Sequence, residues 1–232
     1  MMSSKDKHTQ KNRLLLLGLS FTVVAGLFFG TDIFSTKTAD AAWYTTGGTW
    51  GYRKIITIDN QKVASTTGSN ITSFPMLFSV VDADLKSTGN GGRVGQDDGC
   101  DILFTGADGS NKLSHEIEKY DATTGELVAW VNIPFLSSTS TTPLYIYYGE
   151  DDVANQWDTA DGSNDVWTSG FKGVWHLGNG DSTAANFYTD STSNAYNGTL
   201  LDSDENSAPV AGKVGSAMQL NDPDSITVPD ND

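Results

Sequence analysis

Cysteine is nearly absent from this chain of 232 residues, since Cys100 is the only one. A single cysteine excludes an internal disulfide, so the fold has to be held together by its core. Cys100 stands far from the apolar run near the N-terminus, which disfavours a lipid-anchored mature N-terminus. Because it adjoins a strand expected from Asp101 to Thr105, we expect its thiol to be buried.

Histidine is scarce as well, and only His115 and His176 lie beyond the first 42 residues. Metal sites combine several histidine, cysteine or acidic ligands, so this scarcity disfavours a metal centre built on histidine. We expect His176 to be partly buried with a backbone partner. No nucleophile-elbow motif is present, and Cys100 has no histidine close to it in sequence. With no catalytic constellation visible, the chain is predicted not to be an enzyme.

Basic residues are also few. Beyond Ala42 the chain keeps 26 of its 29 acidic residues but 9 of its 14 lysines and arginines, which gives a net charge of −17 over 190 residues. Nucleic acids and anionic membrane surfaces are bound by basic patches, so the composition disfavours both as partners. The charge fits a soluble exported protein.

Residues 1–42 have the order of regions found in a secretory leader. Basic residues come first, the 17 uncharged residues Leu14–Gly30 follow, and Ala39-Asp40-Ala41 offers a small-residue cleavage site. The apolar run, expected to be a helix, is long for a signal peptide and slightly short for a membrane span, so it is either a cleaved signal or a retained anchor. Either way we expect an extracytoplasmic protein, secreted, periplasmic or at the cell surface. Membrane contact would be limited to residues 14–30 of an uncleaved leader.

Six runs of β-type residues, separated by turn residues, predict an antiparallel β-sandwich at 43–150. The expected strands are Tyr52–Asp59, Phe74–Val81, Asp101–Thr105, His115–Tyr120, Glu126–Ile133 (stopped by Pro134) and Leu144–Tyr148. Apolar residues on both faces place 126–133 and 144–148 centrally or under another element. The strand at 115–120 is expected nearer an edge, and Pro75 places its strand at an edge or a bend.

The composition changes after Glu150. Residues 151–166 are acidic and polar and are predicted to be a linker between domains. From 167 to 232 short apolar runs return, with strands expected at Lys172–Leu177, Val214–Leu220 and Ser225–Val228. The predicted fold class is therefore all-β, with a complete sandwich followed by a second, incomplete β domain.

Five sequence words in the first half carry a family resemblance. They are FPMLF (74–78), CDILFTGADG (100–109), LSHEIEKYD (113–121), ELVAWVNIP (126–134) and YIYYG (145–149). Over about residues 52–149 they resemble the family catalogued as domain of unknown function 2341, although Cys100 stands where that family usually has a small or polar residue. The resemblance implies an exported surface protein. Some members accompany proton-channel subunits of the MotA, TolQ and ExbB type, and the family lends no catalytic residue.

The second half resembles a different family. GVWHL (173–177), DSTSNAYNGT (190–199) and GKVGSAMQL (212–220) are similar to the start of a concanavalin A-like, or laminin G-like, jelly roll over about 170–232. That family includes lectins, adhesive modules and some glycosidases. Only 62 residues follow Gly170, fewer than such a jelly roll needs. We therefore expect either a fragment of a longer protein or strands that dock onto the first sandwich.

Glu116 and Glu118 are the candidates for acid–base chemistry, because residues two apart on a strand share a face. Paired carboxylates can cleave glycosides, but the sequence shows no cleft. Charged side chains on the exposed face of an edge strand also prevent aggregation, and this structural interpretation is favoured.

Acidic loops could hold a structural Ca²⁺, and no other cofactor is expected. The candidate ligands in the lectin-like half are Asp202, Asp204 and Glu205, and a second oxygen-rich loop contains Asp97, Asp98 and Asp101. None of these loops has the EF-hand spacing, so solvated turns are the favoured interpretation.

Aromatic residues divide into core and surface candidates. Trp130 and Trp175 are expected in the core. Tyr188 and Tyr196 stand in polar stretches and are the candidates for stacking on a ligand.

These observations predict an exported, non-catalytic binding or adhesion module whose ligand is a glycan or a protein at the cell surface. Two alternatives stay open: a periplasmic accessory protein of a MotA/TolQ/ExbB-type proton-channel system, and the N-terminal fragment of a glycoside hydrolase.

Overall fold

The structure, a computed structural model, describes residues 41–63, 68–157, 165–168, 170–177, 187–201 and 207–229. These residues form antiparallel β-sheets, with helical structure limited to three short 3₁₀ turns at Asn60–Lys62, Ala83–Leu85 and Thr88–Asn90. The predicted all-β class is confirmed. The helix expected at 14–30 lies outside the described residues, and within them no helix has the length and apolar character needed to span a bilayer.

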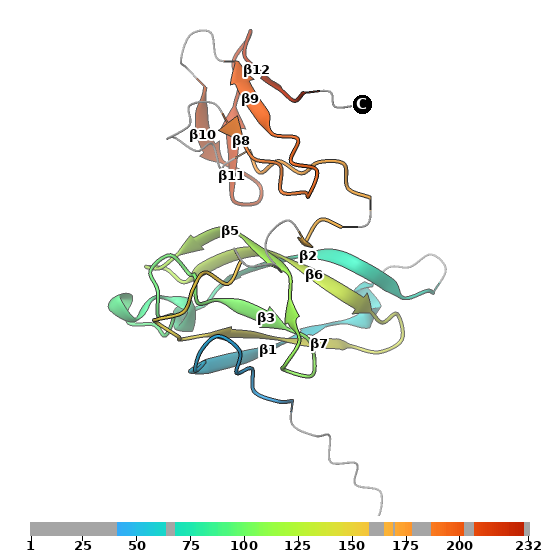
Figure 1. The fold of residues 1–232 in the computed structure, drawn as a ribbon, viewed down its shortest axis with the longest axis vertical. Coiled ribbons are helices and arrows are strands. Elements are labelled where there is room, and N and C mark those ends of the chain that lie inside the picture. Colours follow the sequence, from blue (N-terminus) through green and yellow to red (C-terminus); the bar gives the residue numbers. More distant parts are fainter. Residues whose placement is uncertain are drawn as a thin grey trace, which may run out of the picture. The chain divides into compact units, whose positions relative to one another are not determined.

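Two sheets make the sandwich, and Figure 1 shows them as two layers. One sheet contains, in spatial order, β1 (Tyr52–Ile58), β7 (Thr142–Tyr148), β3 (Leu103–Thr105) and β4 (Lys112–Leu113). The other contains β2 (Ile71–Val81), β6 (Glu126–Leu136) and β5 (His115–Asp121). β6 and β7 are central strands, and β2 and β5 are edge strands, as the hydrophobic pattern and Pro75 predicted.

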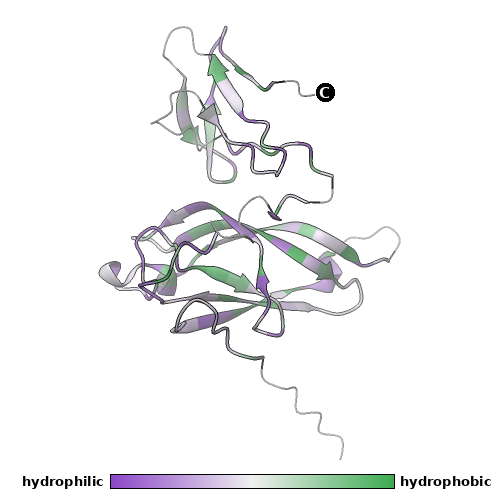
Figure 2. Cartoon of the chain, in the orientation of Figure 1, coloured by the Kyte–Doolittle hydropathy of each residue, from purple (hydrophilic) through white to green (hydrophobic). Residues whose placement is uncertain are grey.

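The main core lies between the sheets. Alternate residues of each strand point inward, and Figure 2 shows hydrophobic residues along β2 and β6. The fully buried members from the two central strands and β3 are Phe104, Leu127, Ala129, Val131, Ile133, Leu144, Ile146 and Tyr148. Contact between such apolar faces is the main source of stability in a fold without disulfides.

A second, smaller core covers the outer face of β7. Tyr44 and Trp50, from the segment before β1, pack with Leu103, Tyr147 and Val153. This explains why β7 is apolar on both faces: one face meets the other sheet, and the other lies under the segment that precedes β1.

Pro134 does not end β6, contrary to the prediction, and the strand continues to Leu136. The pairing of β5 with β6 reaches only Val131, so no strand lies on that side of β6 at Pro134. A proline is tolerated in a strand where its missing N–H has no partner strand to bond.

The sequence favoured a solvated turn for Asp101, and this prediction is wrong, because Asp101 is fully buried. Its carboxylate accepts hydrogen bonds from the backbone N–H groups of Gly95 (2.8 Å), Gln96 (3.2 Å), Gly149 (2.8 Å) and Glu150 (3.1 Å). One side chain thus ties the loop before β3 to the end of β7. The neighbouring Cys100 is only partly buried, less than predicted.

The described part of the acidic stretch, 151–157, packs against the sandwich. Val153 belongs to the second core, and its carbonyl accepts a bond from Gln96 Nε2 at 2.9 Å. Gln156 is buried, its N–H bonds the Cys100 carbonyl at 3.1 Å, and its own carbonyl accepts from Lys112 Nζ at 2.6 Å.

Short strands form the later part of the chain. β8 (Phe187–Tyr188), β9 (Gly198–Leu201) and β12 (Ser225–Thr227) make a sheet in the order β12-β9-β8, and β10 (Ala208–Ala211) pairs with β11 (Ser216–Gln219). The strands expected at 214–220 and 225–228 therefore exist in shorter form. The strand expected at 172–177 is wrong, because within it only Trp175 makes a β-bridge, to Asp190.

Candidate functional site

Glu116 and Glu118 share one face of β5, as their spacing predicted, but the expectation that this face is exposed is wrong. Glu116 is 8% exposed, and the side chain of Glu118 is buried as well. Both carboxylates meet residues from much later in the chain. We call Glu116, Glu118 and His176 the Glu–His cluster.

Glu116 accepts hydrogen bonds from three side chains of the later segment. Its Oε2 accepts from Trp167 Nε1 at 2.7 Å and lies 3.2 Å from His176 Nε2, while its Oε1 accepts from Ser191 Oγ at 2.6 Å. A buried carboxylate is costly unless such donors surround it, so these bonds are the reason that Glu116 can be buried.

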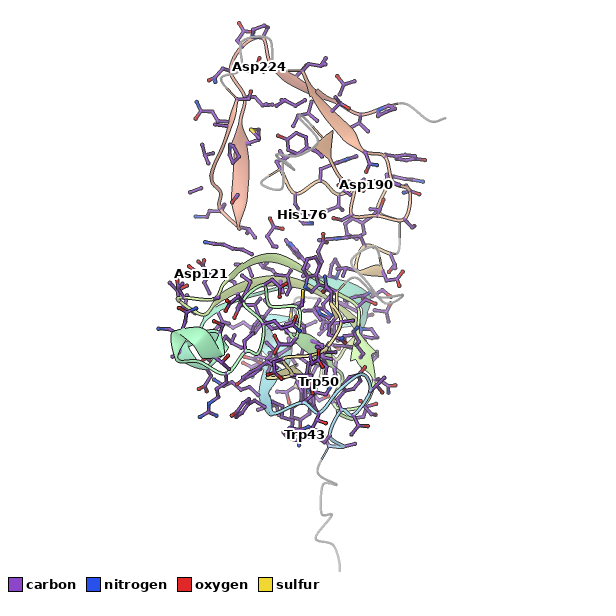
Figure 3. All side chains as sticks on the ribbon, turned by 60° about the vertical axis from the view of Figure 1, so that its left-hand side comes forward. Trp43, Trp50, Asp121, His176, Asp190 and Asp224 are labelled. Carbon is purple, nitrogen blue, oxygen red and sulfur yellow. The ribbon has the colours of Figure 1, made fainter. Side chains whose placement is uncertain are left out.

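His176 lies between the two carboxylates, and Figure 3 labels it where it meets the sandwich. Its Nδ1 is 2.5 Å from Glu118 Oε2, on the other side of the ring from Glu116. Burial alone would lower the pKa of His176, but hydrogen bonds to Glu116 and Glu118 and their negative charges raise it to about 9. The ring is therefore an imidazolium at neutral pH. The predicted backbone partner is wrong: the partners of His176 are two carboxylates.

Aromatic rings surround the cluster. Trp130 of β6 donates from Nε1 to Glu118 Oε2 at 3.2 Å, and its ring centroid lies 5.0 Å from that of Trp167. The Trp167 ring also lies 5.9 Å from the His176 ring and 5.3 Å from the Phe171 ring. Trp130 was expected in the core, but it is only partly buried, and its ring faces the later segment rather than the other sheet.

The pKa of His115 is shifted in the opposite direction to that of His176. It is fully buried in the sandwich, and burial lowers its pKa to about 4. Carbonyl oxygens of Leu113 and Ile102 lie 3.0 Å from its two ring nitrogens, and these contacts oppose the shift without cancelling it. At neutral pH His115 is an uncharged core residue.

Asp190 organises the turn that follows β8. Its carboxylate accepts from the backbone N–H of Val174 (2.8 Å), Thr192 (2.9 Å) and Tyr196 (3.0 Å), and from the Thr192 hydroxyl (2.8 Å). Burial opposes the charged form, but these bonds outweigh it and lower the pKa of Asp190. The turn places Ser191 beside Glu116.

The predicted ligand-binding tyrosines do not form one exposed surface. Tyr188 is in β8 and only 2% exposed, so the expectation of a surface ring is wrong there. Tyr196 is half-buried, and its carbonyl accepts a bond from Trp175 Nε1 at 2.8 Å. The proposed calcium ligands Asp202, Asp204 and Glu205 lie outside the described residues. Among the residues that are described, no group of three or more histidine, cysteine or acidic side chains could hold a metal ion.

A different aromatic surface is exposed, and the sequence interpretation missed it. Trp43 is 44% exposed, and the guanidinium of Arg53 lies 4.7 Å from its ring centroid and 4.6 Å from that of Tyr145. Figure 3 shows Trp43 near Trp50 on the sandwich. Arg53 also donates to the Ala42 carbonyl at 2.9 Å and to the Tyr147 hydroxyl at 3.0 Å, which fixes its position. We call Trp43, Arg53 and Tyr145 the Trp43 patch. The pair of tryptophans in 43–50 was the available signal for it.

Comparison with known families supports the first resemblance. The model of the family described as "Domain of unknown function (DUF2341)" matches residues 98–199. The match begins later than the expected start near 52 and continues past 149, so it contains every residue of the Glu–His cluster. No curated protein and no solved structure matches the chain.

Proposed function

We propose that the chain is an exported, non-catalytic binding module that recognises a glycan at the cell surface through the Trp43 patch. The observation that carries this proposal is a half-exposed tryptophan ring held in place by a cation that is itself anchored. Sugars stack on exposed aromatic rings, and a ring that is already ordered loses little entropy on binding.

The absence of catalysis is part of the same proposal. The two glutamates that could act as an acid–base pair accept bonds from Trp167, Ser191 and Trp130 and flank His176. General acid–base work on a sugar needs a carboxyl group in reach of the substrate, and these groups are turned to the protein instead.

The later strands fit the beginning of a lectin-like jelly roll, which would add a second binding module. Support comes from the antiparallel order β12-β9-β8, from the β10–β11 hairpin, and from the turn held by Asp190. Export is supported by the basic, apolar and small-residue order of 1–42 and by the strong net negative charge.

A glycan array followed by titration calorimetry tests the proposal. The Trp43→Ala variant should bind the best glycan at least about tenfold more weakly, a loss typical of an aromatic anchor. Phe74→Ala is the matched control, because Phe74 is 41% exposed and lies in β2. Equal affinities of the two variants for the glycan, or an array without any bound glycan, would refute the proposal.

A further inference from the structure

A pocket of about 420 Å³ opens in the sandwich, and its lining includes no residue of the Glu–His cluster or the Trp43 patch. Its wall consists of the loop between β3 and β4, the end of β6, and the start of β7. The lining residues are Gly106, Ala107, Asp108, Asn111, Leu113, Ile133, Pro134, Phe135, Thr142, Pro143 and Leu144. Its volume falls within the range of sites that bind small molecules.

The floor of the pocket is part of the main core. Leu113, Ile133 and Leu144 are members of that core and almost fully buried, while Phe135 at the pocket is 51% exposed. An apolar group entering here would contact the exposed side chains of Pro134 and Phe135, which stand over these core residues in a strand that is already ordered, and this lowers the entropy cost of binding.

The pocket lies where the pairing of β7 with β3 and of β6 with β5 has ended. β3 pairs with β7 only through Tyr145–Tyr147, and β5 pairs with β6 only as far as Val131. Pro134 and Pro143 then remove an N–H from each of the two strand segments that line the pocket. Addition of a further strand is disfavoured by these prolines, so the geometry suits a compact ligand better than an extended peptide.

The charge at the pocket has one sign. Asp108 contributes a carboxylate, and none of the lining residues is a lysine, arginine or histidine. Backbone N–H groups of Ser110 (3.0 Å) and Asn111 (3.1 Å) bond the Asp108 carboxylate and lower its pKa. The net charge of −15 of the whole chain adds a long-range attraction for cations.

We propose that this pocket binds a small amphiphilic amine, with its apolar ring or chain against Pro134, Phe135 and Pro143 and its ammonium group at Asp108. The lining residues include none of the Trp43 patch, and the proposal does not depend on the glycan proposal.

Two probes with the same ring and opposite charge test the site. Tryptamine carries an ammonium group, and indole-3-propionate carries a carboxylate. In a ¹⁵N NMR titration of the protein, tryptamine should shift the amide signals of Gly106–Leu113 and of Ile133, Phe135 and Leu144, and indole-3-propionate should not. Equal shifts with both probes, or no shift of these signals with tryptamine, would overturn the proposal.

Two variants separate the charge from the cavity. Asp108→Asn should weaken tryptamine binding about two- to fivefold, the effect of one exposed ion pair. Asp121→Asn is the control, because Asp121 accepts similar backbone bonds from Thr123 and Thr124 in the β5–β6 turn. Gly106→Leu adds a side chain at a lining position where a Cβ would meet only Asp108 Oδ1, at 3.7 Å, so it should fold and abolish the tryptamine shifts. Unchanged tryptamine affinity in Gly106→Leu would place binding elsewhere and refute the site.

Discussion

Replacement of Glu116 by alanine is the most direct test of the Glu–His cluster. The change removes the acceptor for Trp167 Nε1 and Ser191 Oγ and one of the two carboxylates beside His176. Breaking a buried charged pair on one side costs about 3–5 kcal/mol. Because Glu118 still faces His176 after the substitution, we expect the lower end, about 3 kcal/mol.

The matched control is Glu126→Ala. Glu126 lies at the start of β6 and pairs with Lys119 at 2.7 Å, and both side chains are at least a third exposed. Such exposed pairs contribute about 0–1 kcal/mol. The two variants therefore remove the same chemical group from neighbouring strands, in a buried and in an exposed setting.

Urea unfolding followed by circular dichroism and by tryptophan fluorescence measures both losses. Trp130 and Trp167 bond the cluster, so in Glu116→Ala the fluorescence transition should move to lower urea and precede the loss of β-structure. If Glu116→Ala costs no more than Glu126→Ala, the buried contacts of the cluster do not contribute to stability and the reasoning above fails.

Three further predictions concern stability. His176 has a pKa raised to about 9, so its contribution to the free energy of unfolding is complete below about pH 6.5, the usual pKa of histidine, and disappears as the pH rises towards 9. Buried His115 has a pKa lowered to about 4, so it destabilises the fold as the pH falls below 6.5. Unfolding free energies measured by urea titration should thus peak near pH 6.5, and His176→Gln should remove the decline on the alkaline side; an identical decline in that variant would contradict the assignment. Asp101→Ala leaves four backbone N–H groups without their acceptor and should cost about 4 kcal/mol or more by urea unfolding, against less than about 1 kcal/mol for the exposed Asp98→Ala. Trp130→Ala should lower the free energy of unfolding by about 3 kcal/mol in the same assay. A loss below about 1 kcal/mol would mean that the contacts of its ring do not stabilise the fold.

The sandwich strands were predictable because their signals are local. The apolar residues on both faces of β6 and β7 and the turn residues between them are properties of short segments, and they indicate both the strands and their central position. Pro134 misled the prediction, because a proline interrupts a strand only where a neighbouring strand needs its N–H. Whether that neighbour exists depends on where β5 ends, which is a property of the tertiary structure.

The candidate site was harder to predict. The spacing of Glu116 and Glu118 indicates a shared face but not whether water or protein covers it. Their partner His176 is 60 residues away from Glu116 in sequence, so no periodic pattern connects them. The same limit applies to Tyr188, whose polar neighbours in sequence indicated a surface position although the folded chain buries its ring.

The extent of the family match bears on how the chain is divided. A boundary near residue 150 separates Glu116, Glu118 and Trp130 from Trp167, His176 and Ser191. The two glutamates bond these later residues, and the Trp130 ring contacts the Trp167 ring. Cutting there would expose two glutamates and a tryptophan on the face of the β2-β6-β5 sheet that is turned away from the other sheet. The matched span, residues 98–199, contains both sides of these contacts. The Glu–His cluster therefore lies wholly within the matched span, and a fragment that ends near residue 150 would keep both glutamates without their later partners.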